Sequence, residues 1–341
     1  MQTILRNLPQ AVPFRTDPGR KDMVFDCVPF FNEIDILLLR FGILDPYVDR
    51  FIIEESTVTF SGEPKELVFE KNRHLFEKYL PKITHIVVDD TPIEGVDTHY
   101  RDYYQKNRLI KGLEGASSDD VVIFSDADEI PNPKVLKDII DNFDRTRVYH
   151  LAQRNFYVFV NNEEKSGKLL SITGEFPEIA PEKRLWLGTK ICSIDNIPAE
   201  GIVRLRDLVP VDDNRSVRVA DGGWHFGYMG GYREKDPLKR IGVKTKAAAH
   251  QNYNEREILA ETMDHLVLGR DIFGRDARFE RVEIDDTYPQ YLLDHIDEYR
   301  HFVLGRITPF MKLYHYLNMT LGRFCRKAYY KVLRHCKKIT S

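Results

Sequence analysis

Short apolar, β-branched runs alternate with longer amphipathic segments along the first half of the chain. The runs at residues 24–30, 50–56, 83–90 and 120–126 predict strands, and the segments at 31–44, 67–80, 100–115 and from 134 onwards predict helices. Such alternation is typical of βαβ units, in which each helix links two parallel strands. The pattern therefore predicts an α/β fold with a Rossmann-type, mostly parallel sheet and flanking helices.

The pattern of predicted elements changes beyond Arg147, where segments that predict strands are joined by loops rich in Gly, Pro and acidic residues. Helices are expected again at residues 237–250 and 255–268, and from 288 to the end. We expect an N-terminal extension at residues 1–21, one main domain at 22–305 that divides near residue 150, and a helical basic tail at 306–341.

Length and composition favour one large domain. Of 341 residues, 42% are hydrophobic and 11% aromatic, which is enough for a large core. The four cysteines are far apart and form no CxxC pair, so neither a zinc site nor a disulfide framework is expected. No apolar run is long enough for a signal peptide or a membrane span. A soluble, cytoplasmic protein is the expectation.

Charge is distributed unevenly. The overall charge of −3 argues against general nucleic-acid binding. Residues 301–341 contain nine Lys or Arg and no acid, so subtracting them leaves −12 on the first 300 residues. Apolar residues recur every three or four positions in this tail, at Tyr314, Leu317, Leu321, Phe324, Ala328, Val332, Cys336 and Ile339. The resulting basic amphipathic helix could lie on the inner face of an anionic membrane or dock on the acidic body.

An acidic cluster follows the apolar strand at residues 120–126. Asp126, Asp128 and Glu129 come directly after VVIF, where open α/β sheets bind ligands. Oxygen ligands on a short turn suit Mg²⁺ or Mn²⁺, which could bind the diphosphate of a nucleotide and stabilise charge on a leaving group. The alternative is a capping acid with two solvated neighbours.

The segment GGWHFGY at residues 222–228 is a second candidate. Its glycines let the backbone approach a ligand, Trp224 offers a stacking face, and His225 could bind a metal or a phosphate oxygen. The alternative is a turn with a core tryptophan.

These motifs resemble glycosyltransferase family 17, the β-1,4-mannosyl-glycoprotein 4-β-N-acetylglucosaminyltransferase-like enzymes. The matching segments, in the family's order, are FNEIDILLLRFGIL, VDRFIIEESTVTFSGEPKEL, DDVVIFSDADEIP, GGWHFGY and YPQYLL. The resemblance implies a GT-A-like fold, inversion at the anomeric carbon, a UDP-sugar donor, a divalent cation and N-acetylglucosamine as the sugar. Its nucleotide-binding half would end near residue 150, and its acceptor half would follow.

The resemblance also implies roles for individual residues. Asp126 and Asp128 correspond to the DxD pair, and His225 to a histidine that closes the metal or diphosphate site. The other donor-binding candidates are Glu54, Glu55, Ser56, Lys106, Arg108 and Trp224. Relatives often have a further aspartate where this chain has Ser125. We expect a carbohydrate acceptor, and a lipid-linked glycan would agree with a basic tail that lies on a membrane.

Inverting transfer needs a general base for the acceptor hydroxyl. Asp221, beside GGWH, and Glu178 or Glu182, in the loop GEFPEIAPEK, are candidates, although each could be a solvated loop acid. In the segment KRIGVKTKAAAHQ, Lys244, Lys246 and His250 could reach a phosphate or form a solvated helix face.

Two other functions use the same features. A metal-dependent nucleotidyltransferase or phosphohydrolase would use the acidic cluster on phosphate, but it leaves GGWH and YPQYLL unexplained. A non-catalytic carbohydrate-binding protein on the same fold would keep binding after loss of Asp126 or Asp128.

Overall fold

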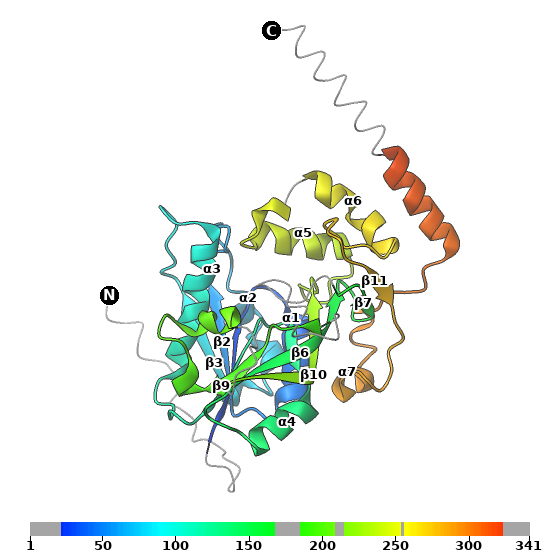
Figure 1. Cartoon of the computed structure of the whole chain (residues 1–341). Helices are drawn as coiled ribbons and strands as arrows, with labels where there is room; N and C mark the ends of the chain where they lie inside the picture. Colours follow the sequence, from blue (N-terminus) through cyan, green and yellow to red (C-terminus); the bar gives the residue numbers. More distant parts are fainter. Residues whose placement is uncertain (1–21, 168–184, 209–214, 254–255, 323–341) are drawn as a thin grey trace.

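A central sheet with helices on both faces organises the protein, and the predicted α/β fold class is confirmed (Figure 1). This computed structural model describes residues 22–167, 185–208, 215–253 and 256–322. Its 11-stranded sheet runs in the order β11-β7-β6-β9-β4-β1-β2-β3, with β10 paired to β5 and β6, and β8 paired to β6.

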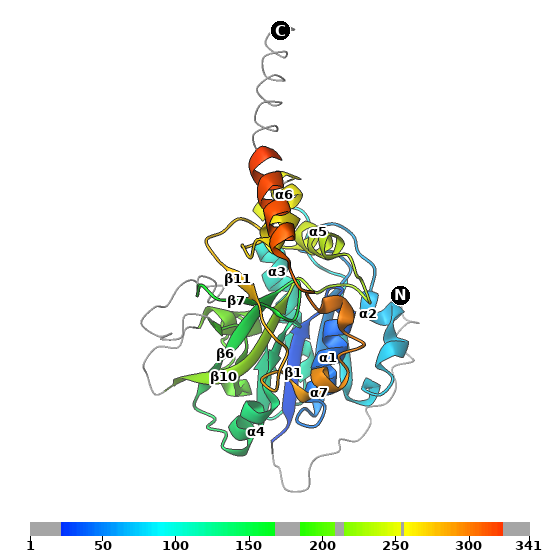
Figure 2. The same ribbon diagram turned by 90° about the vertical axis from the view of Figure 1, so that its right-hand side faces the viewer.

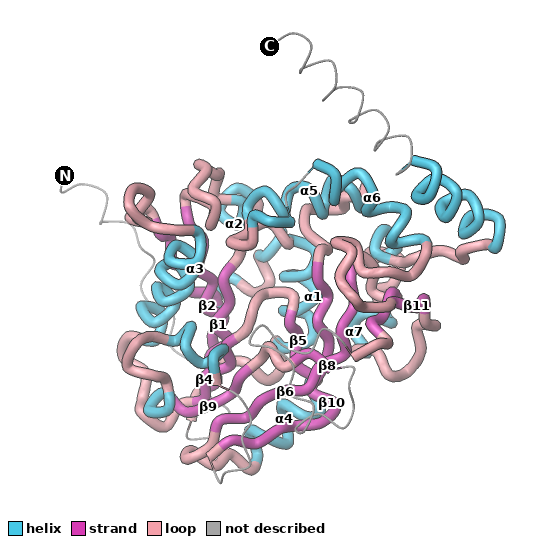
Figure 3. Tube along the Cα trace, turned by 45° about the horizontal axis from the view of Figure 1, so that its top comes forward, coloured by secondary structure: helices cyan, strands magenta, loops and turns pink. Residues whose placement is uncertain are grey.

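The first half of the sheet is parallel. Its strands are β1 (Val24–Pro29), β2 (Arg50–Ser56), β3 (Ile83–Val88) and β4 (Val121–Phe124). The connections contain α1 (Ile34–Leu44), α2 (Val68–Lys71) and α3 (Thr98–Asn107). The carboxyl ends of these strands therefore lie at the same edge of the sheet. In the tilted view, β1, β2 and β4 lie side by side, with α3 next to them (Figure 3).

The second half of the sheet is largely antiparallel, which corrects the expectation of a mostly parallel sheet. It contains β5 (Glu129–Pro131), β6 (Val148–Tyr157), β7 (Asn162–Glu164), β8 (Leu185–Trp186), β9 (Lys190–Ser193), β10 (Ser216–Gly227) and β11 (Phe279–Arg281). Of its strand pairs, only β10 and β6 run parallel. The connection from β6 to β7, residues 158–161, is too short to return the chain in the parallel direction, so these two strands pair antiparallel.

Strand alternation divides the core into two layers. In β1, Val24 and Val28 face the cluster that contains α1, whereas Phe25 and Cys27 face the opposite cluster. The later helices are α4 (Pro133–Asp141), α5 (Pro237–Ala247), α6 (Arg256–Val267) and α7 (Gln290–Asp294). Asn132 and Asp236 cap α4 and α5, each followed by a proline at the first helical turn.

Two predicted helices are wrong in extent. The helix expected at residues 67–80 breaks after Lys71, because the Asn72 side chain donates to the carbonyl oxygen of Val68 at 2.7 Å and ends the turn. The helix expected from residue 288 onwards is interrupted, since α7 ends at Asp294 and the chain becomes helical again at residues 309–322.

Residues 309–322, called the outer helix below, project from the body beside α6 (Figure 2). None of the helices formed by the described residues combines the length and the apolar character that a bilayer span requires.

Candidate active site

A cavity of about 470 Å³ lies at the carboxyl ends of the parallel strands. Pro29 ends β1, Glu54 lies near the end of β2, and Asp126 follows β4; all three line the cavity. The other walls come from α3, α5 and the end of β10. Both its position and its size are those of ligand sites in α/β proteins. Its titratable side chains include Glu33, Glu54, Lys65, Asp102, Lys106, Asp126, Asp128, Arg206, His225, Lys244, His250 and Arg275.

The buried guanidinium of Arg40 holds the acidic turn at residues 125–129 in place. Arg40, on α1, donates to the carbonyl oxygen of Glu129 at 2.7 Å and to Oγ of Ser125 at 2.9 Å. The other edge of this guanidinium contacts both carboxylate oxygens of Asp26, at 2.5 and 2.7 Å. Ser125 therefore faces Arg40, away from the cavity, and an aspartate there would meet the same guanidinium.

Asp126 is paired with two cations. Its carboxylate lies 2.5 Å from Nη1 of Arg206 and 3.1 Å from Nζ of Lys106. Burial alone would raise the pKa of Asp126, but Arg206 and Lys106 outweigh burial and hold this pKa far below its usual value. Asp126 is therefore a carboxylate across the physiological pH range.

Asp128 faces the opposite wall of the cavity. Its Oδ2 accepts a hydrogen bond from Nζ of Lys244 at 2.6 Å, and its Oδ1 lies 3.8 Å from Nε2 of His225. Burial would lower the pKa of Lys244, but the negative charges of Asp128 and Glu33 raise it. Lys244 is therefore an ammonium that bridges α5 and the acidic turn.

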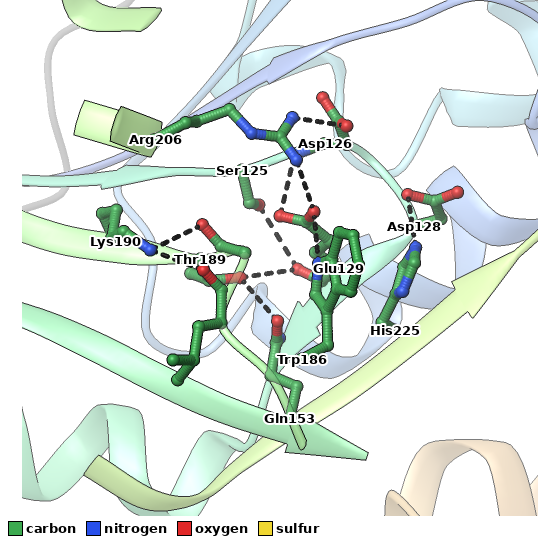
Figure 4. A network of polar contacts seen from close by, with 12 residues as sticks. Ser125, Asp126, Asp128, Glu129, Gln153, Trp186, Thr189, Lys190, Arg206 and His225 are labelled. Atoms are coloured by element: carbon green, nitrogen blue, oxygen red, sulfur yellow. Dashed lines mark hydrogen bonds and ion pairs between the residues drawn. The ribbon is translucent and has the colours of Figure 1, made fainter. Parts of the chain in front are cut away.

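Glu129 points away from Asp128 into a buried polar network (Figure 4). Its Oε1 accepts from Nη2 of Arg206 and from Nε1 of Trp186, both at 2.8 Å. The indole of Trp186 stacks on the imidazole of His225, with ring centroids 4.6 Å apart and planes at 25°. Pairing of β5 with β10 places Glu129 opposite His225, so the network is fixed by strand register.

His225 and Asp128 offer the ligand types that Mn²⁺ or Mg²⁺ accepts. Nδ1 of His225 lies 2.9 Å from Oδ1 of Asn155, so Nδ1 carries the proton and Nε2 keeps its lone pair. Burial lowers the pKa of His225, which favours the neutral imidazole. These two side chains fit a divalent cation, and a cation bound there would displace the Lys244 ammonium. Nowhere in the described ranges do three Asp, Glu, His or Cys side chains already converge.

Glu54 is a buried carboxyl group that faces the cavity. It is 2% exposed, and its Oε1 has no hydrogen-bond partner among the described residues. Burial raises the pKa of Glu54 to about 8, although Lys65 and Lys106 oppose the shift. The group is therefore available to donate a hydrogen bond to a ligand at neutral pH.

Several predicted donor-binding residues lie elsewhere. Glu55 points to the opposite face of β2, where it accepts from the backbone N–H of Phe69 at 3.0 Å. Ser56 hydrogen-bonds Thr91 at 3.2 Å, and Arg108 pairs with Asp90 at 2.9 Å outside the cavity.

Trp224 alternates with His225 on β10 and therefore packs into the core instead of facing the cavity. Asp221 is exposed at a bulge of β10, where its carbonyl oxygen accepts from Asn132, and it does not line the cavity. Glu178 and Glu182 lie outside the described residues. Lys244 and His250 line the cavity, whereas Lys246 does not.

Two residues of the site, Arg206 and Trp186, belong to no sequence motif. Arg206 comes from a 3-10 turn at Ile202–Asp207, and Trp186 from the short strand β8. Both reach the acidic turn only through tertiary folding. Arg206 lies in the segment IVRLRD, and Trp186 is one of the two tryptophans of the chain; neither forms a pattern with the acidic turn.

Part of the chain is similar to one family of known proteins. Residues 14–166 match the profile of glycosyltransferase family 17, a segment that contains the acidic turn. The β-1,4-mannosyl-glycoprotein 4-β-N-acetylglucosaminyltransferases of Homo sapiens and Rattus norvegicus are each 31% identical over 134 residues, which is 37% of this chain. The matched region spans 24% of the human protein and 23% of the rat protein, about a quarter of their length.

Solved structures show weaker likeness. Glucosyl-3-phosphoglycerate synthase of M. tuberculosis has a TM-score of 0.33 at 14% identity, over 80% of this chain and 92% of that one. A mannosyltransferase of Pyrobaculum calidifontis, in complex with GDP-Man and Mn²⁺, has a TM-score of 0.33 at 11% identity, over 89% of this chain and 72% of that one. These scores are too low to support an argument about this chain. The profile match and the curated relatives show that residues 14–166, with the acidic turn, are similar to glycosyltransferase family 17.

Proposed function

We propose that this protein is an inverting, metal-dependent glycosyltransferase that moves N-acetylglucosamine from a UDP-sugar to a hydroxyl of a carbohydrate or lipid-linked glycan. A β-linkage would result. We also propose that residues 22–305 form the catalytic unit. One observation carries the proposal: the acidic turn, His225 and three cations, Lys106, Arg206 and Lys244, meet in one cavity at the carboxyl edge of the sheet.

The cations suit a diphosphate. Lys106, Arg206 and Lys244 already neutralise carboxylates in the cavity, so they can exchange these partners for phosphate oxygens without being newly desolvated. Trp186, held by its stack on His225, offers an aromatic face for a sugar ring. Glu54, protonated at neutral pH, can donate to an oxygen of the donor.

Asp128 and His225, with Asp126 beside them, would hold a divalent cation. When bound, that cation supplies Lewis-acid stabilisation of the leaving diphosphate. Of the three candidate bases, Asp221 does not line the cavity, so Glu178 is the base that we would test first and Glu182 the next, each by replacement with Gln.

The test is UDP release from a panel of UDP-sugars with Mn²⁺, with and without EDTA. We expect turnover of one donor that is lost with EDTA and falls at least about 1,000-fold in Asp126→Ala and in Asp128→Ala. Asp138→Ala, which removes an exposed carboxylate of α4, is the matched control and should keep full activity.

Product analysis separates the rival functions. Mass spectrometry and the anomeric proton coupling of the product should show a new β-glycosidic bond. A phosphorylated or nucleotidylated product would instead establish phosphoryl chemistry. Donor binding without turnover, unchanged in Asp128→Ala, would establish a binding protein.

A further inference from the structure

One face of the outer helix is fixed to the body by polar contacts. His315 and Asn318 both hydrogen-bond the buried carboxylate of Asp264 on α6, at 2.7 and 2.9 Å. Met319, on the same face, is 3% exposed and accepts a hydrogen bond from Arg270. These contacts set the rotation of the helix about its axis, so its other face has a defined direction.

The free face of the outer helix is apolar. The most exposed large apolar side chains of the described residues gather here, with Phe310 78%, Leu321 62%, Tyr314 60% and Leu313 55% exposed, and Leu317 adds 44%. Spacings of three, four, seven and eleven residues place them in one stripe, which we call the apolar stripe. The helix projects from the body (Figures 1 and 2), and the exposed fractions of its side chains show that the stripe meets solvent.

A contiguous apolar stripe on a protruding helix indicates a surface that is covered in use. The described part of the body does not cover the stripe, because the helix turns another face, which contains His315 and Asn318, toward α6. Met311 and Tyr316 are also exposed on the outer helix, and the remaining exposed large apolar residues of the described chain are scattered over β3, α3, α5 and loops, where they form no matching patch for the stripe of a second copy.

The charge of the C-terminal region indicates which kind of partner covers the apolar stripe. Residues 301–341 contain nine Lys or Arg and no Asp or Glu. Packing the stripes of two copies together would bring two such sets of positive charge side by side, which is unfavourable. An anionic lipid surface instead offers an apolar boundary for the stripe and phosphates for the cations.

We propose that the outer helix docks this protein on the surface of an anionic lipid bilayer. The apolar stripe enters the boundary between head groups and acyl chains, Arg306 and Lys312 are exposed beside it, and the net positive charge of residues 301–341 attracts the anionic surface. Because His315 and Asn318 fix the helix on α6, docking also fixes the orientation of the catalytic unit on the bilayer. The proposal goes beyond the proposed transfer reaction and does not depend on it.

The test is co-sedimentation of the full chain with vesicles of phosphatidylcholine alone or with 30% phosphatidylglycerol, a composition of the order that carries a clear negative surface potential. We expect binding to the anionic vesicles that weakens when NaCl is raised from about 0.1 to 0.5 M. A stripe variant, Leu313→Ser/Leu317→Ser/Leu321→Ser, should bind about tenfold or more weakly. Since all three side chains are exposed, the variant should keep the thermal unfolding midpoint of the parent.

The matched control is Ile93→Ser/Ile110→Ser/Leu238→Ser, which removes three exposed apolar side chains from other surfaces and should bind within about twofold of the parent. Equal binding by the stripe variant, or no binding by the parent, would overturn the proposal. A dimer in light scattering that the stripe variant abolishes, without vesicle binding by the parent, would show a second copy as the occupant and would also overturn it. Vesicle binding needs no turnover, so its outcome is independent of the activity assay.

Discussion

Nζ of Lys244 lies 2.6 Å from Oδ2 of Asp128, so one ion pair joins α5 to the acidic turn across the cavity. The ammonium occupies space beside the carboxylate that a divalent cation would use. Binding of metal and donor is therefore expected to move Lys244 from Asp128 to a phosphate oxygen. The exchange keeps both charges compensated.

Lys244→Met should raise the KM for the UDP-sugar about 10- to 100-fold, the effect of losing one charged hydrogen bond to phosphate. The same change should tighten Mn²⁺ binding in the absence of donor, because Asp128 loses a competing cation. Donor titration and Mn²⁺ calorimetry measure the two effects. Lys239→Met, at an exposed lysine of α5 paired with Glu234, is the control and should change neither. Weaker Mn²⁺ binding in Lys244→Met would contradict the exchange.

Arg40→Leu should destabilise the fold by about 3–5 kcal/mol, because it leaves the carboxylate of Asp26 buried without its partner. Urea unfolding monitored by circular dichroism gives the value. The double variant Asp26→Leu/Arg40→Leu should recover much of that loss, since no uncompensated charge remains buried. A double variant that is no more stable than Arg40→Leu would show that the contacts of Arg40 with the acidic turn carry most of the effect.

Glu54 should make stability depend on pH. Its pKa is about 8 in the folded state, against an ordinary value of 4.5, so between these values the folded state binds a proton that the unfolded state lacks. The free energy of unfolding should therefore fall as pH rises from about 5 to 8, by up to about 1.4 kcal/mol per pH unit.

Glu54→Gln should flatten that slope, as measured by urea unfolding at several pH values. Glu66→Gln, whose side chain is 72% exposed, should leave the slope intact. An unchanged slope in Glu54→Gln would show that the carboxyl group titrates near its ordinary pKa.

Trp186→Ala should lower kcat/KM about 10- to 100-fold, because both the stack on His225 and the hydrogen bond to Glu129 are lost. Trp186→Phe keeps a ring over His225 and should lose less. Steady-state kinetics, together with Mn²⁺ affinity, measure the effect. Equal loss in both variants would assign the effect to the hydrogen bond alone.

Much of the parallel half could be predicted because its strands are continuous apolar runs. The expected strand at residues 50–56 has the bounds of β2, and the strand expected at 24–30 ends one residue early, at Pro29. Helix ends were less accurate, because Asn72 uses its own side chain to end a turn that the apolar pattern would continue. Such local competition does not change the pattern of apolar positions.

The direction in which each side chain points explains why some of the predicted site residues line the cavity and others do not. Asp126 and Asp128 were predicted from their place after a buried strand, and they line the cavity. Strand alternation could also have shown that Glu54 and Glu55 face opposite sides of β2. Arg206 could not be found in this way, because 77 residues separate it from Glu129 and only the folded chain joins them.

Because 77 residues separate Glu129 from Arg206, the acidic turn is synthesised well before the cations that pair with it in the second half of the chain. During synthesis at roughly 5–20 residues per second, the carboxylate of Glu129 leaves the ribosome several seconds before the guanidinium of Arg206, and Lys244 follows later still. Until then the acidic turn has no counter-charges from the second half of the chain and must stay hydrated. The parallel half can form early, but its carboxyl edge is completed only when the rest of the chain arrives. A nascent chain stalled between β6 and α5 should therefore expose the acidic turn to solvent and remain a client for chaperones.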